Sequence, residues 1–235
     1  MELELKKECL DTYELGEPQT LTQEETAETI VPDYCPDIAR IISAEGVVCL
    51  HGGTEQDGVT GTVRVTVLYT PENESGVRAL EFAMPFSAQG EGLAGCAHVV
   101  VETEIELLES RMLNPRKIFT RCKLVTHLAG CRKVCLTISS DAETDPALLV
   151  EKRCCGQTVS LLRQVAEKDL TFSETMSLSL GREGAAELLH CRANGIVTET
   201  KAIGNKLIFK GVFLVSALYR TIGGQLASAS AELPF

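Results

Sequence analysis

The sequence predicts a mainly β protein built from two tandem sandwich-like or barrel-like domains, each with one short helix. Short stretches of alternating apolar and polar residues recur along the chain, and turn residues such as Gly52-Gly53, Asp57-Gly58 and Gly223-Gly224 separate them. Regularly spaced short strands are typical of sandwiches and barrels rather than of a parallel α/β sheet. A length of 235 residues suits one large domain or two small ones, and an internal repeat favours two.

Three landmarks of the first half return in the second half in the same order. Gly61–Tyr69 returns as Gly211–Tyr219, Met84-Pro85-Phe86 as Leu233-Pro234-Phe235, and Ile41-Ile42 as Leu188-Leu189, at offsets of 150, 149 and 147 residues. This agreement indicates a duplication, with a first domain at 1–148 and a second at 149–235. Strand-like sequence continues after Phe86 but the printed sequence ends at Phe235. We therefore expect an incomplete second domain whose open strand edges pair with other chains.

In the first copy, residues 3–14 predict a strand, and the polar residues 15–29, with Gly16 and Pro18, are expected to begin as a loop. Residues 36–43 predict the helix, because Pro36 suits the first helical position, Asp37 suits the first turn, and an apolar stripe follows at Ile38, Ile41 and Ile42. Residues 62–69 alternate strictly, which predicts a strand with one apolar face. Further strands are predicted at 47–50, 78–86, 99–108, 117–128 and 132–138.

In the second copy, residues 183–190 predict the matching helix, and strands are predicted at 158–165, 170–180, 193–200, 206–219 and 225–235. The outward residues Arg64 and Thr66 of the first copy become Leu214 and Ser216. The central strand is therefore apolar on both faces, which requires cover either from the first domain or from another subunit. The candidate assembly surface comprises Leu214, Ser216, Leu218 and Phe235.

The net charge of −11 argues against binding a nucleic-acid backbone or an anionic membrane, because both need clustered lysine and arginine. The first eight residues lack the basic start and apolar run of a signal peptide. No stretch approaches the roughly 20 apolar residues of a spanning helix. The sequence thus predicts synthesis in the cytosol and no membrane insertion.

Ten cysteines are unusual for a cytosolic chain and raise the question of metal binding or cross-linking. His127, Cys131 and Cys135 are spaced by four residues, which on a strand places neighbours about 13 Å apart, too far for one zinc ion. Cys49, Cys96 and Cys122 are expected as small core residues. The remaining cysteines lie in polar or terminal surroundings and are the cross-linking candidates: Cys9, Cys131, Cys135, Cys154, Cys155 and Cys191.

Motifs that carry chemistry are scarce. The glycine pairs predict turns rather than phosphate loops, and no Ser/His/Asp or Cys/His set has sequence support. Glu102, Glu104 and Glu106 lie on one face of a strand, which favours a solvated face over ion binding. We therefore predict no catalytic residue, no cofactor and no metal site.

The segment from Val31 to Ile42 resembles the SPOCS domain family of endospore-forming bacteria, which occurs in spore morphogenesis and other spore-envelope proteins. The resemblance covers about residues 25–140. Its motif residues are Pro32, Asp33, Pro36, Asp37 and Ile38, then Val67-Leu68-Tyr69, Met84-Pro85-Phe86, and Leu113, Asn114, Pro115, Arg116 and Lys117. Cys35 departs from the family, whose members are usually polar or basic there. No segment similar to the LysM module of the morphogenesis proteins is present, so the partner of that module is not implied.

The resemblance implies a structural or interaction role in the spore coat, exosporium or a surface appendage. Such a protein is made in the reducing mother-cell cytoplasm and becomes oxidised after lysis, so disulfides between copies would form after assembly. The first hypothesis is a protein that assembles with itself and is cross-linked by cysteines. The second is an adaptor that recruits one spore-coat protein without polymerising. The third is an enzyme or metal-dependent sensor.

Overall fold

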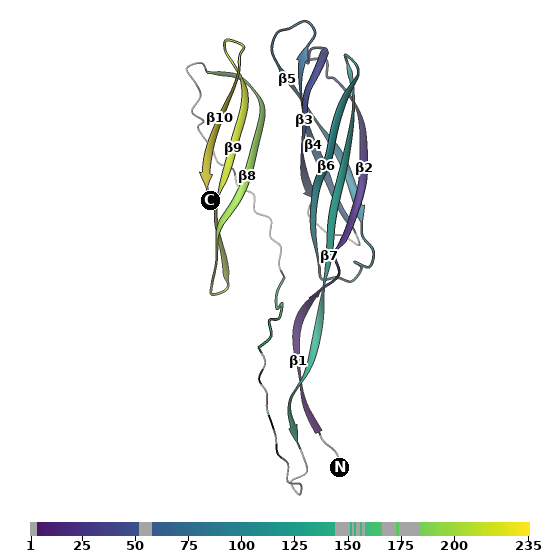
Figure 1. Ribbon diagram of the computed structural model, residues 1–235, viewed down its shortest axis with the longest axis vertical. Coiled ribbons are helices and arrows are strands. Elements are labelled where there is room, and N and C mark those ends of the chain that lie inside the picture. The colour runs from purple at the N-terminus through teal and green to yellow at the C-terminus, as the bar shows by residue number, and fades with distance from the viewer. Residues whose placement is uncertain are drawn as a thin grey trace.

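The computed structural model describes residues 4–51, 58–143, 151, 153, 156, 158–165, 173 and 184–235. Within these residues all regular elements are strands, arranged in three sheets (Figure 1). The first sheet contains β1 (Glu4–Leu15), β2 (Gln19–Ile30), β6 (His98–Asn114) and β7 (Lys117–Glu143). The second contains β3 (Ile38–His51), β4 (Gly58–Pro71) and β5 (Arg78–Gln89). The third contains β8 (Ala185–Ile203), β9 (Lys206–Thr221) and β10 (Leu226–Pro234). The predicted mainly β class is confirmed.

The first and second sheets pack face to face as a sandwich, and the alternation of β4 explains why. Its inward residues Val63, Val65, Val67 and Tyr69 are each at most 1% exposed, as the sequence pattern predicts. The even-numbered residues of β7 close the core from the other sheet, and they include Ile118, Cys122 and Leu124. Alternating side chains of this kind give each sheet one apolar face to bury.

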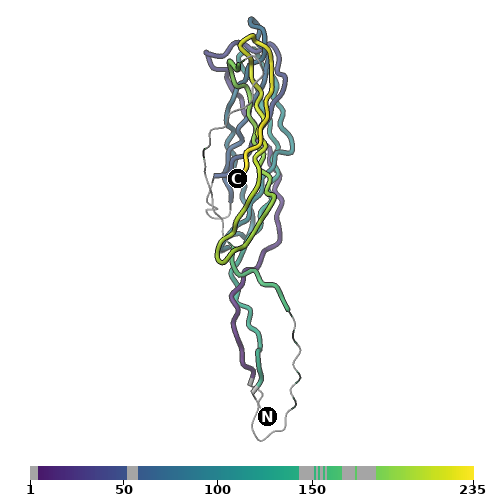
Figure 2. Tube along the Cα trace, turned by 90° about the vertical axis from the view of Figure 1, so that its left-hand side faces the viewer, coloured from purple at the N-terminus to yellow at the C-terminus, as the bar shows by residue number. Residues whose placement is uncertain are grey.

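The 27-residue strand β7 is longer than the sandwich. Its first half pairs with β2 and its second half with β1, both on the side opposite β6. Strand β6 pairs with β7 only as far as Cys131. There His98 of β6 flanks Cys131 on one side and Leu15 of β1 flanks it on the other. Beyond this point β1 and residues 131–143 of β7 continue as a two-stranded ribbon, here called the arm, which extends past the sandwich (Figures 1 and 2).

The predicted helix at 36–43 is wrong. Residues 38–43 begin β3 and pair with β4, with register shifts between Ile38 and Arg40 and between Ile41 and Ser43. Each shift adds one residue to β3 and so changes which side chains face the core. The apolar residues are therefore unevenly spaced, and this spacing resembles the apolar stripe of a helix. Ile38 is fully buried, whereas Ile42 is exposed. β-branched isoleucines also suit a strand better than a helix.

The predicted helix at 183–190 is also wrong, because residues 185–190 begin β8. Residue 183 lies outside the described residues. The predicted strand at 158–165 is irregular chain instead, although the backbone oxygen of Leu162 accepts a hydrogen bond from the nitrogen of Tyr13 (2.7 Å). Apart from residue 173, the predicted strand at 170–180 lies outside the described residues.

The third sheet repeats the second sheet pair by pair. Ala185 pairs with Thr221 as Ile38 pairs with Pro71, and the correspondence continues as far as Val197 with Gly211 and Leu50 with Gly61. Strand β8 has register shifts between Ala185 and Glu187 and between Leu188 and His190, each 147 residues after a shift in β3. Bulges are specific local features of a strand, so this agreement shows that the sequence repeat is also a structural repeat.

Candidate assembly surfaces

The arm has one apolar face that continues the core-facing side of β7. Strand β7 runs without an inserted residue from Lys117 to Ser139, so Leu136 and Ile138 belong to the same alternating series as the buried Ile118 and Leu124. On β1, Leu10 lies opposite Leu136. Leu136 and Ile138 are each 43% exposed, because the second sheet ends before the arm begins. Among the described residues, no second sheet packs against the part of this face that contains Leu136 and Ile138.

The opposite face of the arm carries a disulfide between Cys9 and Cys135, whose Cα atoms are 5.7 Å apart. Cys9 pairs with Thr137 and Asp11 pairs with Cys135, so the two cysteines are diagonal neighbours within disulfide range. This corrects the prediction that both serve as cross-links between chains. A two-stranded ribbon is marginally stable alone, and here a covalent bond holds its strands together.

The third sheet has a face equivalent to the buried face of the second sheet, and it is open at one end. Ala217 and Tyr219 are buried like their counterparts, whereas Val215 is only half-buried. Phe235 is 40% exposed, although its counterpart Phe86 is 5% exposed. The Phe235 ring lies 4.7 Å from the Phe213 ring, centroid to centroid. We call Val215, Leu233 and Phe235 the open patch.

The predicted assembly residues are divided between the two faces of the third sheet. Leu214 is 39% exposed and Ser216 is exposed, whereas Leu218 is half-buried. These three belong to the face opposite the open patch, and Phe235 belongs to the patch itself. The choice between cover by the first domain and cover by another subunit stays a prediction.

Beyond β10, the hairpin formed by residues 196–210 of β8 and β9 continues as a two-stranded extension. The Gly211 nitrogen donates to the Phe235 oxygen and the Phe235 nitrogen donates to the Gly211 oxygen, each at 3.0 Å. These two bonds are the last ones between β9 and the chain at the end of β10. The hairpin exposes several large apolar side chains, namely Ile196, Val197, Ile203, Leu207 and Phe209. A concentration of exposed apolar side chains is typical of an interaction surface.

A cluster of charges attaches the third sheet to the sandwich. Glu187 of β8 accepts hydrogen bonds from Arg78 of β5 and from Arg220 of β9, both 2.8 Å long. Desolvation raises the pKa of the Glu187 carboxyl, but the hydrogen bonds from Arg220 and Arg78 outweigh it and leave the pKa lowered. Nearby, Nε2 of His190 lies 3.2 Å from Oε2 of Glu45 in β3. Glu187 and His190 lie on the same face of the third sheet as Leu218. The open patch is on the opposite face and therefore points away from the sandwich.

Residues 31–38 and 113–117 meet in space through Arg116. Its guanidinium donates hydrogen bonds to the backbone oxygens of Val31 (2.9 Å) and Cys35 (2.8 Å) and to the carboxylates of Asp33 (3.1 Å) and Asp37 (3.0 Å). The Asn114 side chain accepts from the Arg116 nitrogen at 2.9 Å.

Two further contacts complete this cluster. The Pro115 oxygen accepts from the Ile38 nitrogen at 2.9 Å, and the Tyr69 hydroxyl donates to the Pro36 oxygen at 3.3 Å. Pro32 is half-buried in the same loop. The motif residues thus form a clamp between the β2–β3 loop and the β6–β7 turn, which sequence spacing alone does not reveal.

The remaining cross-linking candidates differ in accessibility. Cys131 lies on the predicted side of β7, with Lys133 and Cys135, but it is buried, which corrects its expected accessibility. Cys191 is a free cysteine with an exposed side chain. Cys154 and Cys155 lie outside the described residues. Burial raises the pKa of the Cys122 thiol to about 11, with a smaller contribution from Glu25.

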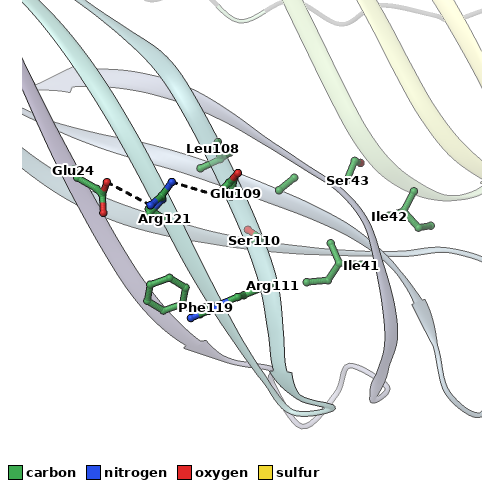
Figure 3. Close-up of a pocket in the computed structure, with 11 residues that line it drawn as sticks. Glu24, Ile41, Ile42, Ser43, Leu108, Glu109, Ser110, Arg111, Phe119 and Arg121 are labelled. Atoms are coloured by element: carbon green, nitrogen blue, oxygen red, sulfur yellow. Dashed lines mark ion pairs between the residues drawn. The ribbon is translucent and has the colours of Figure 1, made fainter.

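An open groove runs between β3 and the first sheet (Figure 3). Arg121 crosses part of it, with nitrogen–oxygen distances of 3.9 Å to Glu24 and 3.5 Å to Glu109. Along β6, Glu102 and Glu104 are exposed and Glu106 pairs with Lys123 at 2.9 Å. Glu106 and Glu109 thus form ion pairs across a solvated sheet face. The groove is lined by none of the predicted assembly residues.

Neither a metal-binding cluster nor a membrane-spanning helix is found in the described residues. They contain no group of three or more histidine, cysteine, aspartate or glutamate side chains placed to hold a metal ion. They also contain no helix long and apolar enough to cross a membrane. No protein-family model matches the chain, and no curated protein or solved structure matches it either.

Proposed function

We propose that this chain is a structural subunit of the bacterial spore envelope, in the coat, exosporium or a surface appendage, and that it assembles with copies of itself without catalysing a reaction. The observation that carries the proposal is that two half-exposed apolar surfaces, the arm face and the open patch, lie on different parts of one molecule. Exposed apolar faces on sheets favour association. A net charge of −11 keeps separate subunits soluble until these surfaces meet.

The assignment to the spore envelope rests on the SPOCS-like motif residues. Their clamp around Arg116 gives them a physical task, because it fixes the β2–β3 loop that leads into the second sheet. The sandwich is then the first SPOCS-type domain, within 1–148, and the third sheet belongs to a second one, within 149–235. In this proposal Cys191, with Cys154 and Cys155, supplies disulfides between assembled copies, and other spore-coat proteins are further partners.

The experiment is to purify the full chain and compare its size by analytical ultracentrifugation and negative-stain microscopy over a range of concentrations. We expect rings, sheets or filaments that persist in reductant and become resistant to detergent after oxidation. A chain that stays monomeric at every concentration would contradict the proposal. A stoichiometric complex with one coat protein and no self-association would replace it with an adaptor role. Antibody labelling of spores from the source organism tests the location.

A further inference from the structure

We propose that the outer edge of β7 in the arm pairs with the same edge of a second copy, so that two arms form one four-stranded antiparallel sheet. This inference rests on the proposed function and names one contact through which copies associate. The partner is a second molecule of this chain, related to the first by a two-fold axis, which is the commonest symmetry of protein dimers.

The first step is the direction in which the backbone groups of β7 point. The Cys131 oxygen accepts a hydrogen bond from the Ala97 nitrogen on the β6 side, at 2.8 Å. The Gly130 oxygen accepts from the Gly16 nitrogen on the β1 side, also at 2.8 Å. Successive residues of a strand point their backbone groups to opposite edges, so the odd-numbered residues of β7 present theirs on the β6 side. Beyond Cys131 these are Lys133, Cys135, Thr137 and Ser139.

The second step is that this edge continues the one that β6 occupies. Strand β6 pairs with β7 from Lys117 to Cys131. Among the described residues, no strand pairs with the β6 side of β7 beyond Cys131. Each odd-numbered residue of the arm therefore presents one N–H and one C=O that another strand can bind. An open strand edge of this kind is a template for pairing with another chain.

The opposite edge of the arm, formed by β1, already binds a further segment of its own chain. The Tyr13 nitrogen donates to the Leu162 oxygen at 2.7 Å, and the Thr12 hydroxyl donates to the same oxygen at 3.0 Å. Tyr13 lies opposite Lys133, and opposite residues of this kind point their backbone groups to the two outer edges. The contact with Leu162 therefore favours the β7 edge as the position for a second molecule.

The sequence of the β7 edge suits pairing with itself. Residues 134–140 contain no charged residue, proline or glycine and include Val134, Thr137 and Ile138. High β propensity with low charge is typical of segments that pair between chains. Parallel pairing would place Lys133 beside Lys133 of the second copy, and like charges directly opposite each other are destabilising. Antiparallel pairing separates these two lysines, so the two edges should run in opposite directions.

The register follows from the length of the regular edge. The pairing of β1 with β7 passes over Ser140, and a bulge of this kind interrupts regular pairing. The regular edge therefore runs from Lys133 to Ser139, and its full use places the two-fold axis at Leu136. Leu136 then lies opposite Leu136 of the second copy, and Val134 lies opposite Ile138 of the second copy.

This register joins compatible side chains. Leu136 and Ile138 are each 43% exposed, and an apolar neighbour from the second copy would cover part of each. Lys133 would lie opposite the neutral Ser139, so no like charges would meet. The disulfide between Cys9 and Cys135 holds the two strands of one arm together, which limits the conformational freedom lost when two arms pair.

The first test is a cross-link in the full chain. Across the proposed interface the two copies of Leu136 form an opposite pair with Cα atoms about 4.5 Å apart, which is within disulfide range. Mild oxidation of Leu136→Cys should therefore give dimers joined through residue 136. Peptide mass mapping identifies this bond and checks that Cys9 stays bonded to Cys135.

Val134→Cys is the matched control for the cross-link. Its two copies would lie about 13 Å apart along the strands, so this variant alone should not dimerise through residue 134. Mixed with Ile138→Cys, it should form a bond between residues 134 and 138 of two chains. This pattern distinguishes the proposed register from non-specific contact between arms.

The second test removes one backbone donor from the edge. Thr137→Pro lacks an N–H that points away from β1, and proline is tolerated at such edge positions, so circular dichroism should show an intact fold. Association should weaken at least about tenfold, because each copy loses a donor at the interface. Thr137→Val keeps the N–H and should associate like the unchanged chain.

The two tests separate this inference from the proposed function. Assembly of the unchanged chain, with no cross-link through residue 136 or with undiminished association of Thr137→Pro, would overturn the inference and leave the proposed function standing. An unchanged chain that stays monomeric at every concentration would overturn both.

Discussion

Arg116 and Asp37 are 79 residues apart in sequence, yet a guanidinium nitrogen of Arg116 lies 3.0 Å from a carboxylate oxygen of Asp37. The same guanidinium also binds two backbone oxygens of the loop that contains Asp37. A planar fork with several donors can satisfy this arrangement, whereas a lysine ammonium cannot reach the same set of acceptors. The clamp therefore depends on arginine itself and not only on positive charge.

Replacing Arg116 should weaken the sandwich. We expect Arg116→Ala to lower the free energy of unfolding by about 2–3 kcal/mol, because backbone oxygens lose their donors. Arg116→Lys should recover less than half of this loss. Urea unfolding measures both values, and Arg64→Ala, at an exposed position of β4, should stay within about 0.5 kcal/mol. Equal stability of the alanine and lysine variants would contradict the requirement for a fork.

Tyr69 should make the fold sensitive to alkali. Burial, followed by interaction with Cys35, raises the pKa of its phenol from 10.0 to about 12. The unfolded chain therefore loses this proton first as pH rises. The contribution to stability is complete below pH 10 and declines between pH 10 and about 12.

The comparison for this prediction is Tyr69→Phe, which has no proton to lose. Its free energy of unfolding should fall less steeply over the same pH window, although the lost hydrogen bond to the Pro36 oxygen should cost about 1 kcal/mol at neutral pH. Tyr34→Phe, at an exposed position, controls for removal of a tyrosine. Parallel pH profiles for the unchanged chain and Tyr69→Phe would show that the phenol has the same pKa in the folded and the unfolded chain.

Acid should loosen the third sheet from the sandwich through Glu187. The pKa of the Glu187 carboxyl is lowered in the folded chain from its ordinary value of 4.5. The carboxylate therefore contributes its full stability above pH 4.5, and this contribution is lost as the pH falls through the pKa of the folded chain. Hydrogen exchange of residues 185–191 should therefore accelerate on acidification. Glu187→Gln should accelerate it already at neutral pH and remove much of the acid dependence. Glu232→Gln, on β10, is the control and should behave like the unchanged chain.

The alternating strand at 62–69 was predictable from sequence because it depends on a period of two, which local residues determine. The duplication was predictable because it needs only order and spacing. The strands at the positions of the predicted helices, 36–43 and 183–190, were not predictable. A bulged strand and a helix produce similar apolar spacings over a few residues. Pairing with β4 and β9 decided between them, and this long-range contact has no local signal.

The assembly surfaces were predictable only in part. Leu214 and Phe235 are partly exposed, and their role in assembly stays a prediction. The arm exists because β7 is longer than the sandwich, and strand patterns do not locate strand ends well enough to predict this length. The pairing of Cys9 with Cys135 requires the register of β1 against β7, and 126 residues separate the two cysteines. The Arg116 clamp likewise depends on two loops brought together by the sandwich.

Loss of the Cys9–Cys135 disulfide should affect the arm more than the sandwich. Opening the bond with Cys9→Ser and Cys135→Ser removes a cross-link that closes a long loop, so unfolding should become easier by about 2–4 kcal/mol. Hydrogen exchange should rise in residues 4–15 and 131–143 and change little in β4. The double variant avoids a new free thiol. Covalent dimers of the unchanged chain that disappear in this variant would instead assign the two cysteines to contacts between chains.

Thiol reactivity should separate the free cysteines. Cys191 is exposed and should react with a maleimide reagent within the dead time of a native-state labelling experiment, because the reagent can reach its sulfur. Cys122 is fully buried and its thiol has a pKa of about 11, so little thiolate is present at pH 8 and labelling should wait for unfolding. Peptide mass mapping measures both rates, and Cys191→Ser identifies the fast site. Rapid labelling of Cys122 in the folded chain would show that the sandwich opens far more often than its packed core implies.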